Sequence, residues 1–247
     1  MSVYDLMCSP LARGKFVGAI MDSAGGPIPC MTQEEFSTDY CNKFVDSLGV
    51  GVEGMRSMDA DELWGKWAEF LGDNAPAPLP TQPVHGDDVL PEDVAETWRK
   101  AEFADVPVLI GTNLNEDQSF VADPHAHGMR DGFYSGTLAF CEKMAASGKS
   151  DAFMYQFGAT PPGEPNAGAW HSAELMYVFQ TLLRSYRPYS GADFDLSNAM
   201  NSYWANFIKT GNPNGEGIDG EALPKWDSFK ENGECILFDT AFPPKMI

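Results

Sequence analysis

Three short strings of this 247-residue chain carry side chains able to do chemistry on a bound substrate. Glu116 follows the string PVLIGTN, His171 lies in GAWHSAE, and Ser23 lies in MDSAGG. A carboxylate bonded to one imidazole nitrogen fixes the tautomer and stabilises the imidazolium, which leaves the other nitrogen to accept a hydroxyl proton. A carboxylate, an imidazole and a hydroxyl that meet in one place therefore activate the hydroxyl as a nucleophile.

Other reactive residue types have plainer interpretations. Ser119 and Ser172 are close in sequence to the carboxylate and the histidine, but side chains of neighbouring residues usually point apart, so both serines are interpreted as structural. His125 and His127 form an H-x-H pair that lacks a third converging ligand, which favours an exposed loop over a metal site. The sequence therefore predicts no metal and no cofactor.

Elements that position these residues follow from the apolar pattern. Short apolar runs closed by glycine are typical of buried parallel strands, and such runs occupy residues 16–21, 106–113 and 151–159. Helical spacing or capping signals predict helices at Val3–Cys8, Thr32–Leu48, Asp59–Leu71, Val94–Ala101, 136–147 and Leu196–Ile208. This alternation of strands and helices predicts an α/β fold with a small parallel sheet flanked by helices.

Local signals mark element boundaries. Thr32 and Glu35 form a capping-box pattern at the start of one helix. The proline-rich stretch 72–93 is expected to be an extended loop rather than a domain boundary, so residues 1–247 are predicted to form a single domain. The tail at 226–239 is expected to be a hairpin that turns at Asn232 and Gly233.

Five strings together resemble, in order and spacing, segments of the type-B carboxylesterase and cholinesterase-like family of α/β-hydrolases. They are SPLARGKFVGAIMDSAG at 9–25, HGDDVLPE at 85–92, PVLIGTNLNEDQSF at 107–120, GAWHSAELMYVF at 168–179 and SYWANFIKTGNPNG at 202–215. The resemblance covers essentially the whole chain and implies the C-terminal part of an α/β-hydrolase fold.

The resemblance also implies roles for individual residues. In that family a GTN-x-x-E string supplies the acid of the catalytic triad, and a G-x-x-H-x-x-E string supplies its base. These positions match Glu116 and His171 here. The acid follows a predicted strand, at the carboxyl end where open α/β sheets gather their sites. Glu174 matches the acidic residue after the base and is expected to cap a helix or form a salt bridge.

The family places its nucleophilic serine in a Gly-x-Ser-x-Gly elbow, just before a helix similar to residues 1–10, and no such string occurs in this chain. Ser23 corresponds to a family serine beside the triad acid. We predict that Ser23 acts as the nucleophile, with Gly25 and Gly26 as backbone donors to an oxyanion. The alternative is that Ser23 only donates a hydrogen bond to Glu116.

These roles predict a serine hydrolase for short or medium carboxylic esters. The alternative function is a non-catalytic hydrolase-like protein, or a fragment that needs an N-terminal half. If the first strands of the family fold are missing, the strand at 16–21 exposes an unpaired edge. Such edges pair readily, so we expect a homo-oligomer formed across this edge.

Composition limits the partners. Sixteen basic and 36 acidic residues give a formal charge of −20, which disfavours nucleic acid and anionic membranes and leaves a small-molecule ester as the expected partner. Five cysteines without a CxxC pair are expected to be free thiols. No apolar run reaches the roughly twenty residues of a membrane helix, and the N-terminus lacks a signal-peptide pattern. A cytoplasmic location is expected.

Overall fold

The computed structural model describes residues 2–73, 83–116, 132–163, 168–240 and 243–247. The chain divides into two compact units, and each is considered by itself. The larger unit comprises residues 1–7, 12–27 and 103–247, and the smaller comprises residues 8–11 and 28–102. The expectation of a single domain stays a prediction.

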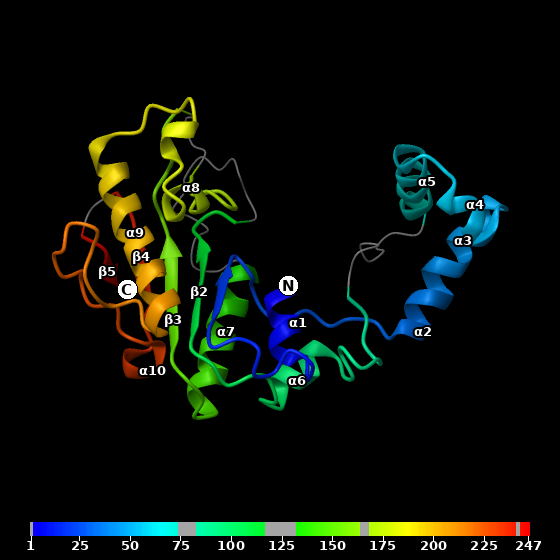
Figure 1. The fold of residues 1–247 in the computed structure, drawn as a ribbon, viewed down its shortest axis with the longest axis horizontal. Coiled ribbons are helices and arrows are strands. Elements are labelled where there is room, and N and C mark those ends of the chain that lie inside the picture. The colour runs from blue at the N-terminus through cyan, green and yellow to red at the C-terminus, as the bar shows by residue number, and fades with distance from the viewer. Residues whose placement is uncertain (1, 74–82, 117–131, 164–167, 241–242) are drawn as a thin grey trace. The chain divides into compact units, whose positions relative to one another are not determined.

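A five-stranded sheet forms the centre of the larger unit (Figure 1). Its strands follow chain order: β1 (Ala19–Asp22), β2 (Val108–Asn113), β3 (Ala152–Phe157), β4 (Ile236–Phe238) and β5 (Lys245–Met246). The first four strands are parallel and β5 is antiparallel to β4. Every residue of β2 and β3 is buried, as expected for apolar strands covered on both faces. The sheet confirms the predicted α/β class.

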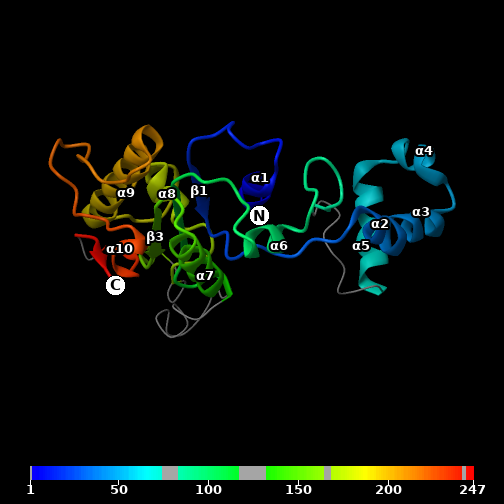
Figure 2. The same cartoon turned by 90° about the horizontal axis from the view of Figure 1, so that it is seen from below.

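Helices cover both faces of this sheet. In two perpendicular views, α8 (Leu175–Val178) and α9 (Gly191–Thr210) lie on one face, while α7 (Gly132–Ala146) and α10 (Phe229–Asn232) lie on the other (Figures 1 and 2). The helix α9 ends at Thr210, because Gly211 adopts the left-handed φ of 74° that closes a helix. The described part of this unit also contains most of α1 (Ser2–Cys8) and the 3₁₀ turn η2 (Leu182–Arg184).

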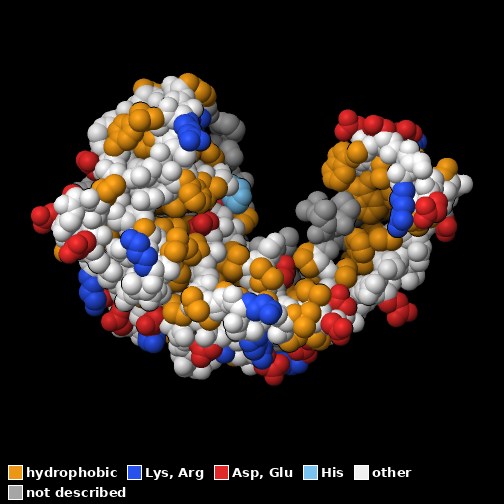
Figure 3. All heavy atoms as spheres, viewed as in Figure 1, with side chains coloured by type: hydrophobic (Ala, Val, Ile, Leu, Met, Phe, Trp, Pro, Cys, Tyr) orange, Lys and Arg blue, Asp and Glu red, His pale blue; other side chains and the backbone are white. Residues whose placement is uncertain are grey.

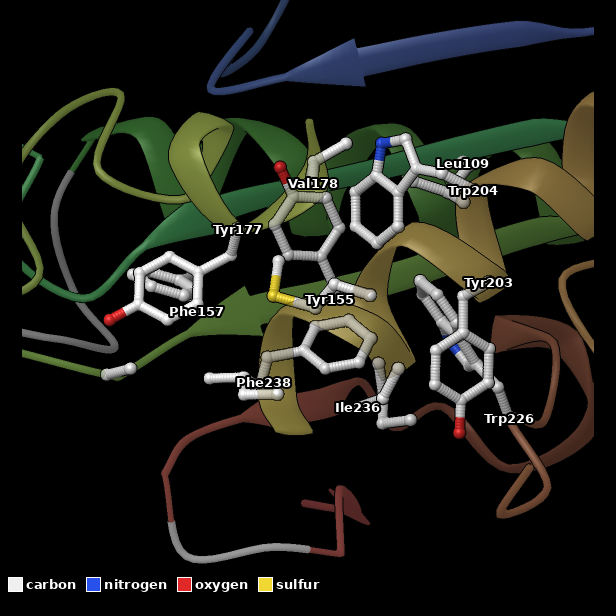
Figure 4. Packing of buried hydrophobic residues seen from close by; sticks show 14 of the residues in the cluster. Leu109, Tyr155, Phe157, Tyr177, Val178, Tyr203, Trp204, Trp226, Ile236 and Phe238 are labelled. Carbon is white, nitrogen blue, oxygen red and sulfur yellow. The ribbon is translucent and has the colours of Figure 1, made fainter. Parts of the chain in front are cut away.

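Aromatic side chains make up much of the core between the sheet and α9 (Figure 4). Trp226 is fully buried and contacts the rings of Tyr155, Tyr203 and Phe238 at centroid distances of 6.4, 5.5 and 5.4 Å. Its indole nitrogen donates to the carbonyl oxygen of Met154 at 3.1 Å, so burial leaves no unpaired donor at this position. Because Tyr203 belongs to α9, Tyr155 to β3 and Phe238 to β4, this packing joins α9 to the sheet.

The predicted hairpin in the tail is wrong. Residues 229–232 form α10 instead, because Ser228 and Glu231 make a capping box and Gly233 closes the helix with a φ of 74°. The following strand β4 then pairs in parallel with β3, and its antiparallel partner is β5, nearer the C-terminus.

Six helical segments make up most of the described part of the smaller unit: α2 (Gln33–Phe36), the π-helical η1 (Ser37–Cys41), α3 (Asn42–Leu48), α4 (Gly51–Arg56), α5 (Ala60–Asp73) and α6 (Val94–Arg99). The predicted capping box of Thr32 and Glu35 is present in both directions. Phe44 packs edge-on against Trp67 at 4.9 Å, which anchors α3 on α5. The sequence did not predict α4.

The described residues contain neither a membrane-spanning helix nor a disulfide. Among the described residues, no helix combines the length and the apolar character that crossing a membrane requires. None of the five cysteines, all of which lie in described residues, forms a disulfide, in agreement with the predicted thiols.

Candidate active site

The candidate site lies at the carboxyl edge of the sheet, where segments that follow three neighbouring parallel strands come together. Ser23 follows β1, the turn 114–116 follows β2, and the segment 168–174 lies between β3 and α8. A short parallel bridge joins Asn115 to Trp170. The acid and the histidine are therefore brought together although they lie 55 positions apart in sequence.

Glu116 and His171 form the hydrogen bond that the sequence predicts. Nδ1 of His171 lies 2.5 Å from Oε2 of Glu116. The carboxylate has no exposed side-chain surface, whereas 53% of the imidazole surface is exposed. Because the ionised carboxylate only accepts, Nδ1 carries the hydrogen, and Nε2 is left to take a proton from a reacting hydroxyl.

Further contacts fix this pair. The backbone N–H of Asn113 donates to the second oxygen of Glu116 at 2.7 Å. The N–H of Asn115 donates to the carbonyl of Ala169 at 3.1 Å, and the N–H of Ala169 donates to Oδ1 of Asn115 at 2.9 Å. The imidazole also lies 5.8 Å from the ring of Phe133, the second residue of α7. The acid and base are thus held by strand ends rather than by a free loop.

Ser23 lies at the same edge of the sheet but is not engaged with the pair. Its N–H continues the β1–β2 ladder by donating to the carbonyl of Gly111 at 2.9 Å. Its φ of 53° is left-handed, which is costly for a residue with a Cβ. Its Oγ is buried and has no hydrogen-bond partner among the described residues, so it bonds neither His171 nor Glu116.

Glu174 occupies the N-cap position of α8, in agreement with one of its two expected roles, but its side chain is used elsewhere. It is 1% exposed, its side chain makes no capping hydrogen bond to α8, and it accepts a hydrogen bond from Nδ2 of Asn113. Burial raises the pKa of Glu174 to about 7, with the nearby Asp22 and Glu116 adding to the rise and the bond from Asn113 opposing it. The side chain thus accepts from Asn113 at the end of β2 rather than from the first turn of α8.

Asp22, the last residue of β1, is a further carboxylate at this edge of the sheet, and the sequence did not identify it. It accepts a hydrogen bond of 2.9 Å from the hydroxyl of Tyr155 on β3. Burial raises the pKa of Asp22 above its ordinary value, and the hydrogen bond from Tyr155 offsets only part of this rise. Burial, followed by the charge of Asp22, also raises the pKa of Tyr155 well above its ordinary value. Three carboxyl groups thus lie near one another beneath the half-exposed imidazole.

The remaining candidates contribute less. Ser119, His125 and His127 lie outside the described residues. Ser172 is exposed, with a left-handed φ of 70°. Within the described ranges, no three His, Cys, Asp or Glu side chains converge as metal ligands. The carbonyl oxygen of Gly25 accepts a hydrogen bond of 2.6 Å from Tyr4, while the role of the Gly25 and Gly26 amides as oxyanion donors stays a prediction.

The parallel sheet with helices on both faces, and the acid–histidine pair at its carboxyl edge, are those of the α/β-hydrolase class. Comparison with known proteins agrees. A model of the carboxylesterase family matches residues 1–132 and 126–243, and the chain belongs to this family.

The relatives and solved structures that this chain matches are longer than the chain itself. Cocaine esterase of Homo sapiens is 26% identical over 298 residues, covering 95% of this chain and 51% of that protein. Para-nitrobenzyl esterase of Bacillus subtilis (strain 168) is 27% identical over 286 residues, covering 97% of this chain and 56% of that protein. The fold matches a thermophilic PNB esterase with a TM-score of 0.78 at 22% identity, over 100% of this chain and 58% of that one. The chain therefore spans about half the length of these relatives.

Proposed function

We propose that this chain hydrolyses short or medium carboxylic esters, with His171 as general base, Glu116 as its orienting carboxylate and Ser23 as the nucleophile. The observation that carries the proposal is the 2.5 Å contact between a buried carboxylate and a half-exposed imidazole. Family membership and the esterase names of the relatives support the substrate class.

Three features support Ser23 as the nucleophile. It follows a parallel strand at the edge of the sheet that carries the acid–histidine pair, and its left-handed φ of 53° is the kind of backbone strain that clusters at functional sites. Its Oγ also has no competing hydrogen bond within the described part of the chain. Because this oxygen is enclosed, the mechanism requires segment 23–26 to move until Oγ reaches Nε2 of His171, within about 2.6–3.2 Å.

The chemistry then follows in balanced steps. Oγ of Ser23 forms a bond to the ester carbonyl carbon while its proton passes to Nε2. The carbon–oxygen bond to the alcohol breaks, and the leaving oxygen takes the proton from the imidazolium. Water repeats the sequence on the acyl-serine, which releases the carboxylic acid and restores Ser23. Glu116 remains ionised throughout and stabilises the imidazolium.

Labelling with a fluorophosphonate tests the proposal. We expect the wild-type chain to hydrolyse p-nitrophenyl esters and to carry the phosphonyl group on Ser23, located by peptide mass spectrometry. Ser23→Ala should abolish both labelling and hydrolysis, because no hydroxyl remains to attack. Ser172→Ala is the matched control, since this serine is adjacent to His171 in sequence, and it should retain both. A label on another residue would remove Ser23 from the mechanism.

A second candidate function is a non-catalytic hydrolase-like chain, or one that needs an N-terminal half. It is favoured by the lack of a Gly-x-Ser-x-Gly string in the sequence and by the enclosed position of the Ser23 hydroxyl. A wild-type chain that neither reacts with the fluorophosphonate nor hydrolyses the esters would support this candidate over the first.

The edge of the sheet supports a proposal about assembly. The N–H groups of Ala19 and Ser23 point toward β2, so those of Ile20 and Asp22 point to the open side, where no described strand pairs. Exposed Val17 and Ile208 lie beside this edge, around a hollow of about 470 Å³. Hydrophobic patches also interrupt the charged surface of the larger unit (Figure 3). We propose that a second copy pairs here.

Light scattering coupled to size-exclusion chromatography tests this assembly. The wild-type chain should elute as a dimer or higher oligomer. Val17→Lys should shift the population toward monomer, because a lysine beside a bare edge opposes strand pairing. Val52→Lys replaces an exposed valine of the smaller unit and should leave the mass unchanged. A well-behaved wild-type monomer would contradict the proposal.

A further inference from the structure

Asn113 donates hydrogen bonds to several groups around the acid–histidine pair, although the proposed mechanism gives it no part in the reaction. It is the last residue of β2 and is fully buried. Its backbone N–H donates to Oε1 of Glu116 at 2.7 Å. Its side-chain Nδ2 donates to the carbonyl oxygen of Trp170 at 2.6 Å, and also to the carboxyl group of Glu174. One residue therefore contacts the acid and both sides of the segment that carries the base.

The two hydrogens of the amide are both in use. One reaches the residue immediately before His171, and the other reaches the residue three positions after it. Shifting His171 relative to β2 therefore breaks at least one hydrogen bond in a buried region, where an unpaired donor is expensive. The strand itself cannot follow, because its neighbours β1 and β3 hold it in register on both sides.

We propose that Asn113 is a positioning residue that sets the distance between Nδ1 of His171 and Oε2 of Glu116. It holds Glu116 through its backbone and the histidine segment through its amide, without touching the reacting atoms. The inference rests on the proposed function, because the distance matters to catalysis only if His171 and Glu116 take part in ester hydrolysis.

The chemistry of the amide explains why asparagine stands at this position. Its NH₂ group supplies two donors, and both acceptors are oxygen atoms. An aspartate has nearly the same shape but would direct an oxygen toward the Trp170 carbonyl and the Glu174 carboxyl group. The hydrogen bond from the Asn113 amide to Glu174 also persists when Glu174 gains or loses a proton, since a carboxyl group keeps an acceptor oxygen in either protonation state.

Proton NMR of the whole chain at fixed pH tests the proposal without any turnover. The proton between His171 and Glu116 should resonate far downfield of the amide region, as expected for so short a hydrogen bond. His171→Gln assigns the signal by removing it. Asn113→Asp should abolish the signal, because the two segments are no longer held together. Asn214→Asp is the matched control, as Asn214 donates through Nδ2 to the carbonyl of Trp226 at 2.8 Å, away from this pair.

Milder variants keep the test decisive if Asn113→Asp does not fold. Glu174→Gln retains an acceptor oxygen and should retain the signal. Glu174→Ala removes one acceptor, and exchange of the downfield proton with solvent should become about tenfold faster, the effect of losing one buried hydrogen bond. An unchanged signal in a folded Asn113→Asp chain, or unchanged exchange in Glu174→Ala, would overturn the proposal. So would the lack of a downfield signal in the wild type.

Discussion

Replacing His171 by alanine is expected to lower kcat/KM for p-nitrophenyl esters by about 10⁴-fold, close to the background rate. The imidazole is the group on which both proton transfers depend: it accepts the serine proton and then protonates the leaving alcohol. Since its Nδ1 is occupied by Glu116, only Nε2 is free to do this, and no described side chain takes its place beside the buried carboxylate. Initial rates measured over a range of substrate concentrations give the comparison.

His85→Ala provides the matched control for this loss. His85 belongs to the smaller unit and contributes to the structure through its backbone, which accepts from the N–H of Gln33 at 3.0 Å. Its replacement should leave kcat/KM within about twofold of the wild type, as for a surface change away from the chemistry. A His171→Ala chain that keeps most of its activity would show that ester hydrolysis takes place elsewhere.

The fold was predictable wherever one apolar signal dominated. The strands β2 and β3 fall inside the predicted ranges because each is a continuous buried run. The strand β1 begins at Ala19 rather than Phe16, since hydrophobicity alone did not reveal that Val17 is 88% exposed. Strands β4 and β5 have three and two residues, which is too short to leave a periodic pattern.

The candidate site was predictable only in part, for a different physical reason. Glu116 and His171 stand in recognisable strings, and the structure joins them. The contacts of Asn113 link it to residues 57 and 61 positions away, which no local pattern encodes. Asp22 meets Tyr155 across 133 positions and was missed for the same reason. Strand neighbours far apart in sequence supply the surroundings of the pair, so those surroundings become visible only in the folded chain.

Glu116→Gln is expected to reduce kcat by about 10³–10⁴-fold while leaving the fold intact, because the change affects one hydrogen position rather than packing. In the wild type the N–H of Asn113 donates to Oε1 of Glu116 at 2.7 Å. The amide oxygen of a glutamine can accept this same hydrogen bond. The NH₂ group would then face Nδ1 of His171 as a donor. The imidazole then accepts this hydrogen bond at Nδ1 and carries its own hydrogen on Nε2. In this tautomer Nε2 is unable to take a proton from a hydroxyl.

The nitrogen chemical shifts of His171 distinguish this tautomer change from a general loss of structure. In the wild type the hydrogen should lie on Nδ1, and in Glu116→Gln it should lie on Nε2, with thermal unfolding otherwise similar. Glu142→Gln is the matched control, because Glu142 is an exposed carboxylate on α7 and its loss should change neither kcat nor the tautomer. If Glu116→Gln lost activity while its imidazole kept the hydrogen on Nδ1, orientation by the carboxylate would not explain the loss. The negative charge of Glu116, acting on the imidazolium, would then be the larger contribution to catalysis.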